Sequence, residues 1–483
     1  MAQTNTKTGW EWIKLGFHAF LFAGSVRKGA VTMEKENKMA VMPMSKLIIT
    51  MSLPLMLSLL IQSLYNIVDS IFVAKLGEDA LTATSLVFPM QMLMIAVGVG
   101  TGVGVNAVLS RNIGAKNTAM VENVAMTGLI LSLISTAVFM IMGFTCTRSF
   151  VYAFTEDEDI AAYSIQYLSI CMIFCVGSLV STMFQRFLQS VGDTFYSMVS
   201  LIAGAVTNLI LDPIMIFGLM GFPVLGIRGA AIATVIGQCV SAVVAIWLNA
   251  VKNPTVKITW KNYKIDKQIV AQIYKVGLPT IVTQAIGSVM MAAVNGILMP
   301  FSSTAVAFFG VYYKLQNFLF MPMNGLGQAA IPIVGFCYGS KNYGRLKEAI
   351  RTVLPIGIGI SFAATALFMA FPSRLLGLFS PGREMLAIGV PALRIICITF
   401  SFASVTMILG YAMSGVGNGL INMLGTALRQ LIIFVPLAYL FAVYFGIEKV
   451  WYSIWISETA AMGYAIIASR NVLKKRGIWS RTT

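Results

Sequence analysis

The sequence predicts an all-α integral membrane protein with twelve transmembrane helices, arranged as two six-helix lobes with internal pseudo-two-fold symmetry. Composition is the first observation behind this prediction. Of the 483 residues, 58% are hydrophobic and only 11% are charged, whereas a soluble globular domain is about 25% charged. The second observation is a series of long apolar segments, and the third is an internal repeat that divides this series into equal halves.

Twelve apolar segments can be counted, each of roughly 20 residues or more, which is enough for a helix to cross a bilayer. We place them near residues 46–74, 81–109, 121–145, 159–186, 195–219, 229–251, 268–299, 304–335, 346–371, 385–412, 420–445 and 448–470. The chain then divides into an N-terminal cytoplasmic arm, two lobes, a basic cytoplasmic linker and a cytoplasmic tail. In chain order these are residues 1–45 (arm), 46–251 (N-terminal lobe), 252–267 (linker), 268–470 (C-terminal lobe) and 471–483 (tail).

The two halves match each other when the chain is shifted by 225 residues. Matching motifs include Leu53-Pro54 with Leu278-Pro279, Gln91 with Gln316, Gly114-Ala-Lys-Asn117 with Gly339-Ser-Lys-Asn342, and Val191-Gly192-Asp193 with Val416-Gly417-Asn418. Each lobe has six predicted helices, an even number, so the second lobe begins on the same side of the bilayer as the first. Both lobes therefore have the same orientation, and the axis that relates them lies along the membrane normal. Parallel repeats of this kind are typical of transporters that work by alternating access.

The charge distribution predicts the topology. The net charge is +16, from 34 Lys and Arg against 18 Asp and Glu. If both termini are cytoplasmic, 16 of the basic residues fall in the inner loops and C-terminal tail, and only six fall in the outer loops. This is the positive-inside bias of multi-pass membrane proteins. We therefore expect a plasma-membrane protein whose partner is the lipid bilayer, and no nucleic-acid partner.

Sequence motifs for catalysis and for ATP hydrolysis are absent. There is no GxxxxGK[ST] phosphate loop and no HExxH motif. The single His18 lies in the N-terminal arm, so a Ser-His or Cys-His site within the membrane has no base. The six cysteines include no CxxC pair, and we expect neither a disulfide nor a metal site from them. The chain is predicted to be no enzyme, to need no cofactor and to draw on an ion gradient.

A polar stripe in the first apolar segment is the strongest candidate for a functional site. Gln62, Tyr65 and Asp69 recur at helical spacing, so they share one face that must meet protein or a water-filled cavity. Asn208 and Asp212 share a face of the fifth segment in the same way. If the two faces meet, the two buried carboxyl groups cannot both ionise easily. They would share a proton or bind a cation, and the coupling ion would be H⁺ or Na⁺.

Neither carboxylate has a partner in the second half of the repeat. Asp69 falls on Val294, and Asp212 falls near Leu437 or Val435. We interpret this difference as a specialised cation site in the N-terminal lobe, with no other metal site expected. In the alternative interpretation each Asp lies at a helix end near an interface, where Asp212 and the proline that follows it would form a turn.

Other polar residues within apolar segments are weaker candidates. Tyr167, Gln185 and Thr234 could line the same cavity, although each alone is more often a packing residue. In the second lobe four charged residues fall inside apolar segments: Lys314, Arg394, Arg429 and Glu458. We expect Arg394 and Glu458 to form a buried pair or to line a pore, and the other two to snorkel to an interface.

Several stretches together resemble one known family. They are YNIVDSIFVAKLG at 65–77, SVGDT at 190–194, NLILDP at 208–213, GIRGAAIAT at 226–234 and FMPMNGLGQAAIPIVGFCYGSKN at 320–342. The chain resembles the multidrug and toxic compound extrusion (MATE) family over roughly residues 46–472. The resemblance implies twelve helices in two lobes and export of small organic drugs or metabolites, often cationic, in exchange for H⁺ or Na⁺. We expect a monomer.

Carried over to this chain, the resemblance implies a coupling site of Asp69, Asn208 and Asp212. Around it would lie Tyr65, Tyr167, Gln185 and Thr234. The chain departs from the family pattern at Gln185, where the family often has Asn, and at Cys337, which replaces a common Asn. In helices 7 and 10, where one branch uses carboxylates, the polar candidates are Gln284 and Arg394. The main alternative function is a flippase for a lipid-linked precursor, which predicts a lateral groove and a more cationic central cavity.

Overall fold

The computed structural model describes residues 37–260, 263–379 and 382–479, and every regular element within these ranges is a helix. Most of the predicted N-terminal arm, residues 1–36, lies outside the described residues.

The helices form two lobes. The first contains α2 (Lys38–Val41), α3 (Met44–Ala74), α4 (Glu78–Gly114), α5 (Thr118–Thr145), α6 (Thr147–Tyr152), α7 (Glu158–Ile173), α8 (Val176–Ser190), α9 (Thr194–Phe217), η1 (Leu219–Gly221) and α10 (Ile227–Lys252). The second contains α11 (Lys267–Leu298), α12 (Ser303–Gly339), α13 (Tyr343–Ala370), α14 (Pro372–Gly377), α15 (Arg383–Cys397), α16 (Phe400–Gly415), α17 (Leu420–Ala427), η2 (Leu428–Ile432), α18 (Phe434–Phe445), η3 (Ile447–Lys449) and α19 (Tyr452–Lys475). Shifting the bounds of α4, α5 and α6 by 225 residues reproduces those of α12, α13 and α14.

The predicted count of twelve spans agrees with the helices. Nine described helices are long and apolar enough to cross a bilayer, and two bent pairs raise the number to eleven. The pairs are α7 with α8, bent by 45°, and α15 with α16, bent by 50°. They are equivalent in the repeat, and each corresponds to one predicted segment. The remaining predicted span is α19, which carries Glu458 and packs along α16.

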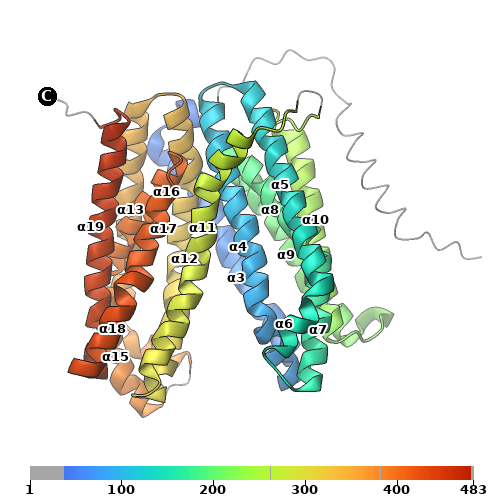
Figure 1. The fold of residues 1–483 in the computed structure, drawn as a ribbon, viewed down its shortest axis with the longest axis vertical. Helices are drawn as coiled ribbons and strands as arrows, with labels where there is room; N and C mark the ends of the chain where they lie inside the picture. The colour runs from blue at the N-terminus through green and yellow to red at the C-terminus, as the bar shows by residue number, and fades with distance from the viewer. Residues whose placement is uncertain (1–36, 261–262, 380–381, 480–483) are drawn as a thin grey trace, which may run out of the picture.

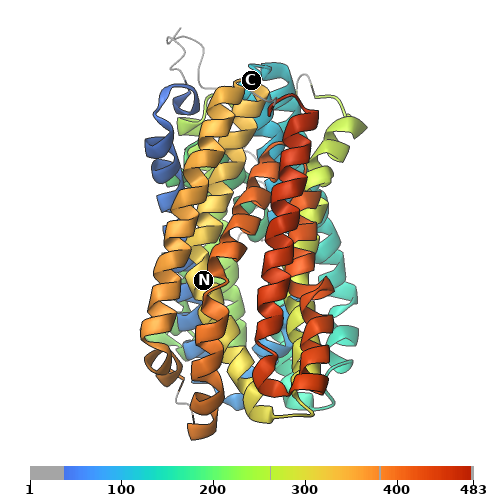
Figure 2. The same ribbon diagram turned by 90° about the vertical axis from the view of Figure 1, so that its left-hand side faces the viewer.

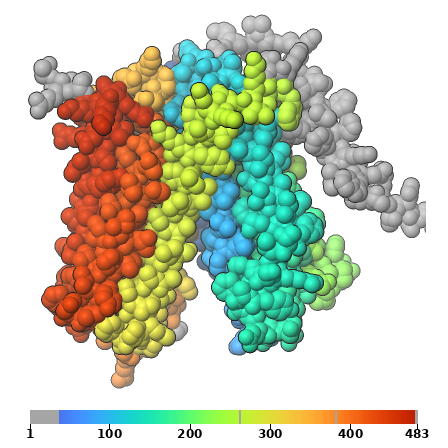
Figure 3. Space-filling view, in the orientation of Figure 1, coloured from blue at the N-terminus to red at the C-terminus, as the bar shows by residue number. Residues whose placement is uncertain are grey.

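The two lobes lie side by side, with α3 to α10 in one and α11 to α19 in the other (Figure 1). Figure 2 looks onto the C-terminal lobe, whose helices run nearly parallel to the long axis. We call the end that carries the α10–α11 connection and the end of α19 the linker end. The lobes meet at this end, whereas a cleft separates them at the opposite end (Figure 3).

Symmetry-related glycines let the lobes approach closely. A Cβ added to Gly100 would lie 2.8 Å from the Gly277 carbonyl oxygen of α11, and one added to Gly325 would lie 2.7 Å from the Met56 nitrogen of α3. Nearer the linker end, a Cβ on Gly114 or Gly339 would collide with a backbone carbonyl of the other lobe. Glycine is the residue that permits such close backbone contact. The contact therefore closes the linker end of the molecule.

Candidate functional site

Four helices of the N-terminal lobe bring the predicted polar residues together. Asn208 and Asp212 lie one turn apart on α9, and the Asn208 Nδ2 donates to Asp212 Oδ1 at 3.0 Å. The same Nδ2 lies 3.4 Å from the Thr234 Oγ1 of α10. Asp212 is completely buried and Asn208 is 4% exposed. The predicted contact between neighbours on one helix face is therefore present, and α10 adds a further polar group.

Asp69 of α3 faces Asp212. The two carboxyl groups are direct neighbours, and the ionisation of one therefore depends on that of the other. The Asp69 Oδ1 and the Asp212 Oδ2 are both buried, and neither has a hydrogen-bond partner among the described residues. Buried oxygens without a donor are costly. The pair therefore has the chemistry of a site that takes up a proton or a small cation with a preference for oxygen ligands.

No described basic residue neutralises this pair. Within residues 37–260, 263–379 and 382–479 only two ion pairs form, Lys38 with Asp193 and Arg429 with Glu458. No group of three or more His, Cys, Asp or Glu side chains that could hold a metal ion occurs in the same ranges. If both carboxyl groups are ionised, their negative charge must therefore be balanced by a bound cation; otherwise one of them must be protonated.

Asp212 also does not end its helix. The α9 helix continues through Pro213 to Phe217, and the chain turns only at Gly218, which has the left-handed φ of 71°. The alternative in which Asp212 and its proline form a turn near an interface does not describe this geometry.

Aromatic and amide side chains surround the carboxyl pair. Tyr65 lies near Asp69 and beside Gln62, on the same face of α3. Tyr167 of α7 is 5% exposed, and its hydroxyl lies beside Thr234 and Gln91 of α4. These contacts place Gln62, Tyr65, Tyr167 and Thr234 beside the pair.

Gln91 is a site neighbour that the sequence did not identify. It was visible as a lone amide in an apolar segment, and its match with Gln316 across the repeat suggested a scaffold role in both lobes. Its position beside Tyr167 depends on the packing of α4 against α7.

Gln185 lies apart from the carboxyl pair. Its side chain donates to the Ser241 Oγ of α10 at 3.4 Å. Ser241 follows Thr234 by seven residues, which is about 10 Å along a helix. The structure therefore does not bring Gln185 into the group around Asp69, and places it nearer the linker end.

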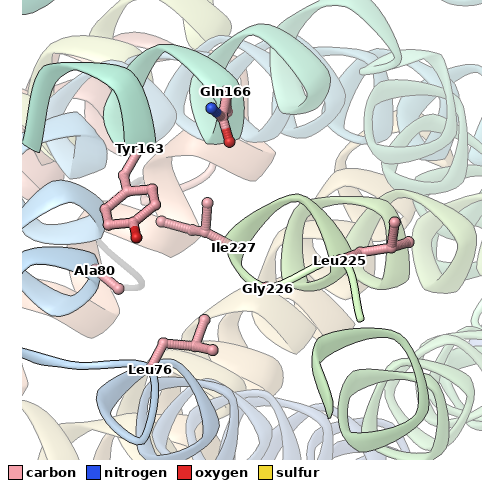
Figure 4. Close-up of a pocket in the computed structure, with 7 residues that line it drawn as sticks. All are labelled: Leu76, Ala80, Tyr163, Gln166, Leu225, Gly226 and Ile227. Atoms are coloured by element: carbon pink, nitrogen blue, oxygen red, sulfur yellow. The ribbon is translucent and has the colours of Figure 1, made fainter. Parts of the chain in front are cut away.

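A small cavity lies at the other end of the same helices. Its volume is about 110 Å³, and its lining consists of Leu76, Ala80, Tyr163, Gln166, Leu225, Gly226 and Ile227. Figure 4 shows the Tyr163 hydroxyl directed toward the Ala80 side of this cavity. Leu76 follows Asp69 by seven residues and lies in the turn just after α3, so the cavity lies about two helical turns beyond the carboxyl pair. It is separate from the candidate site.

In the C-terminal lobe, the predicted pairing of Arg394 with Glu458 is wrong. The Arg429 Nε lies 3.3 Å from Glu458 Oε1, and both side chains are nearly fully buried. Arg429 also lies over the Phe320 ring, 5.9 Å from its centroid, so it does not snorkel to an interface. Arg394 and Gln284 are exposed and make no pair with Glu458. The π-helical turn η2 carries Arg429 and turns it toward α19.

Breaking this buried pair is expected to destabilise the C-terminal lobe. Glu458→Gln should lower the free energy of unfolding by about 3–5 kcal/mol, because the Arg429 charge would remain buried without a partner. The measurement is thermal unfolding of the purified protein in detergent. Replacing both residues by methionine should recover most of the lost free energy of unfolding. Equal stability of Glu458→Gln and the unchanged protein would contradict a closed, dry ion pair here.

The chain resembles known transporters along most of its length. A family profile described as MatE matches residues 54–214 and 279–440, one stretch in each lobe. The probable multidrug resistance protein YoeA of Bacillus subtilis is 26% identical over 418 residues, which are 86% of this chain and 90% of YoeA. The multidrug export protein MepA of Staphylococcus haemolyticus is 25% identical over 411 residues, 84% of this chain and 89% of MepA. An outward-facing structure of a multidrug resistance MATE family transporter superposes with a TM-score of 0.85 at 28% identity, over 92% of this chain and all of that one.

Proposed function

Because the chain belongs to the MATE family of multidrug efflux transporters, we propose that it exchanges H⁺ or Na⁺ for small organic, often cationic, drugs or metabolites by alternating access. Members of this family are transporters and not enzymes. The names of the YoeA and MepA relatives, a multidrug resistance protein and a multidrug export protein, support the proposed substrate class.

The observation that carries the proposal is the pair of facing carboxyl groups, the buried Asp212 and the half-buried Asp69, without a described counter-cation. Asp69 and Asp212 would bind the coupling ion, and Asn208 would hold Asp212 in place through its 3.0 Å hydrogen bond. Binding of H⁺ or Na⁺ removes the repulsion between the carboxylates. Since α3 contains Pro54, which interrupts its hydrogen-bond ladder, α3 can reorganise when its charge is neutralised.

Ion and substrate would compete through this reorganisation. If the coupling ion weakens substrate binding, linkage requires the substrate to weaken ion binding by the same factor. The cleft between the lobes opens away from the linker end. We assign the linker end to the cytoplasm, with both termini there and residues 252–267 as the inner linker between lobes 46–251 and 268–470. With this assignment the described state is open to the outside of the plasma membrane.

The test is counterflow of a fluorescent organic cation in proteoliposomes of the full chain. A pH gradient or a Na⁺ gradient is imposed alone, and we expect one of them to drive substrate against its concentration gradient. The ion that succeeds is the coupling ion. Transport of a labelled lipid-linked precursor without movement of the cation would support the flippase alternative and contradict the proposal. As a control, an ionophore that collapses the H⁺ or Na⁺ gradient should abolish accumulation of the fluorescent substrate.

A further inference from the structure

Two arginines from different lobes meet on one turn at the linker end. The turn Val416-Gly417-Asn418 joins α16 to α17, and Gly417 has a φ of 92°. A Cβ added to Gly417 would lie 3.0 Å from the Arg111 Cζ, so the Arg111 guanidinium of α4 lies against this glycine. Arg476, just after α19, donates from Nη1 to the Val416 oxygen at 2.7 Å. The two guanidinium groups are therefore held on adjacent residues.

These guanidinium groups are incompletely satisfied. Arg111 donates from Nε to the Ala107 oxygen at 3.1 Å, and Arg476 lies over the Tyr338 ring, 5.1 Å from its centroid. Both side chains are partly buried. Neither forms an ion pair with any carboxylate of the described residues. Two cations in this position repel each other, and each guanidinium retains N–H donors that can bind two oxygens of one oxyanion.

The equivalent turn of the N-terminal lobe contains a carboxylate that the C-terminal turn lacks. In Val191-Gly192-Asp193, Gly192 has a φ of 94°, and the Lys38 side chain lies against it, with Cε 3.0 Å from an added Cβ. The Lys38 Nζ pairs with Asp193 Oδ1 at 2.6 Å. In both turns, a basic side chain from elsewhere in the chain thus packs over the glycine. The N-terminal turn supplies its own carboxylate, whereas the C-terminal turn has the neutral Asn418 at the matching position.

We propose that Arg111 and Arg476 together bind a phosphate group, supplied by an anionic phospholipid headgroup or by free phosphate. Arginine is the side chain best suited to bidentate recognition of phosphate. Arg111 belongs to the N-terminal lobe and Arg476 to the C-terminal lobe, so the bound phosphate bridges the lobes at the linker end. A ligand that binds one state better than another stabilises that state. The phosphate therefore favours the state in which this end is closed.

The first experiment measures binding to the full chain in detergent. Phosphatidylglycerol, phosphatidylcholine or inorganic phosphate is added at constant ionic strength, and lipid retention by native mass spectrometry and the unfolding temperature are recorded. We expect phosphatidylglycerol, but not phosphatidylcholine, to be retained and to raise the unfolding temperature. A rise with inorganic phosphate as well would identify the phosphate group itself as the ligand. A rise with phosphatidylglycerol alone would identify the lipid headgroup.

The second experiment locates the site. Arg111→Gln and Arg476→Gln should each weaken phosphatidylglycerol binding by about tenfold, equal to about 1.4 kcal/mol. Arg470→Gln, an exposed arginine of α19, is the matched control and should bind like the unchanged protein. Equal binding by all of these variants would overturn the proposal.

Asn418→Asp tests the proposal without removing an arginine. This substitution gives the C-terminal turn the carboxylate that Asp193 supplies in the N-terminal turn. We expect the variant to fold and, without added lipid, to unfold at the same temperature as the unchanged protein or at a higher one, because the new carboxylate reduces the repulsion between the arginines. Its response to phosphatidylglycerol should be lost. A full response in Asn418→Asp would show that the anion binds elsewhere.

Discussion

Asp69→Asn is expected to abolish ion-driven efflux. The substitution keeps the size of the side chain and removes the charge that faces Asp212. We expect the affinity for the coupling ion to fall by about two orders of magnitude, which corresponds to about 3 kcal/mol of lost binding free energy. The measurement is substrate affinity as a function of pH and of Na⁺ concentration, together with counterflow in proteoliposomes. The unchanged protein should lose substrate affinity as the coupling ion is added, and Asp69→Asn should show no such dependence.

Asp212→Asn should have the same effect, because the two carboxyl groups act as one site. Asp79→Asn is the matched control, since Asp79 is an exposed acid at the start of α4. Undiminished ion-driven efflux in Asp69→Asn would remove Asp69 from the mechanism. Loss of efflux in Asp79→Asn to the same degree would show that the effect is not specific to Asp69 and Asp212.

Gly339→Val is expected to open the linker end. An added Cβ at Gly339 collides with the Arg111 carbonyl oxygen of the other lobe, and a backbone atom cannot move aside as a flexible side chain can. Overpacking costs about 1–3 kcal/mol even where side chains can adjust. We expect the cost here to shift the population away from the closed linker end. Gly114→Val should act in the same way, because Gly114 meets the Phe336 carbonyl across the pseudo-two-fold axis.

The distance between the lobes provides the measurement. Spin labels at the exposed positions Ala119 and Glu348 would report the separation of α5 and α13 at this end, after replacement of the exposed Cys146 by serine. Gly359→Val is the control, because an added Cβ at Gly359 on α13 meets nothing within 4 Å. An unchanged distance distribution in folded Gly339→Val would show that the glycine contact does not hold this end closed.

Much of the fold was predictable because it depends on local properties of the chain. Apolar runs of sufficient length predict spans, since lipid requires each helix to satisfy its own backbone. The repeat offset then predicts which helices are equivalent, and the shifted bounds of α4 to α6 confirm it. The breaks between α7 and α8 and between α15 and α16 were not predictable, because the sequence remains apolar through both.

The candidate site was predictable only in part. Asn208 and Asp212 are one turn apart on one helix, so their contact follows from helical periodicity alone. The approach of Asp69 to Asp212 was a conditional expectation, since periodicity shows that each helix has a polar face and does not show which faces meet. The same limit explains why Gln185 was expected beside Asp69 but lies with Ser241.

By itself the sequence determined the membrane class, the two equivalent lobes, the absence of a carboxylate in the second lobe opposite Asp69, and the family resemblance. Only the tertiary structure decided the partners of charged residues that are distant in the chain. Glu458 pairs with Arg429 and not with Arg394, because the π-helical turn η2 turns Arg429 toward α19. Arg111 and Arg476 are 365 positions apart in the chain. They meet on one turn because α4 and α19 both end at the linker end of the molecule. The physical reason is that burial selects faces locally, whereas the pairing of faces depends on how all the helices pack together.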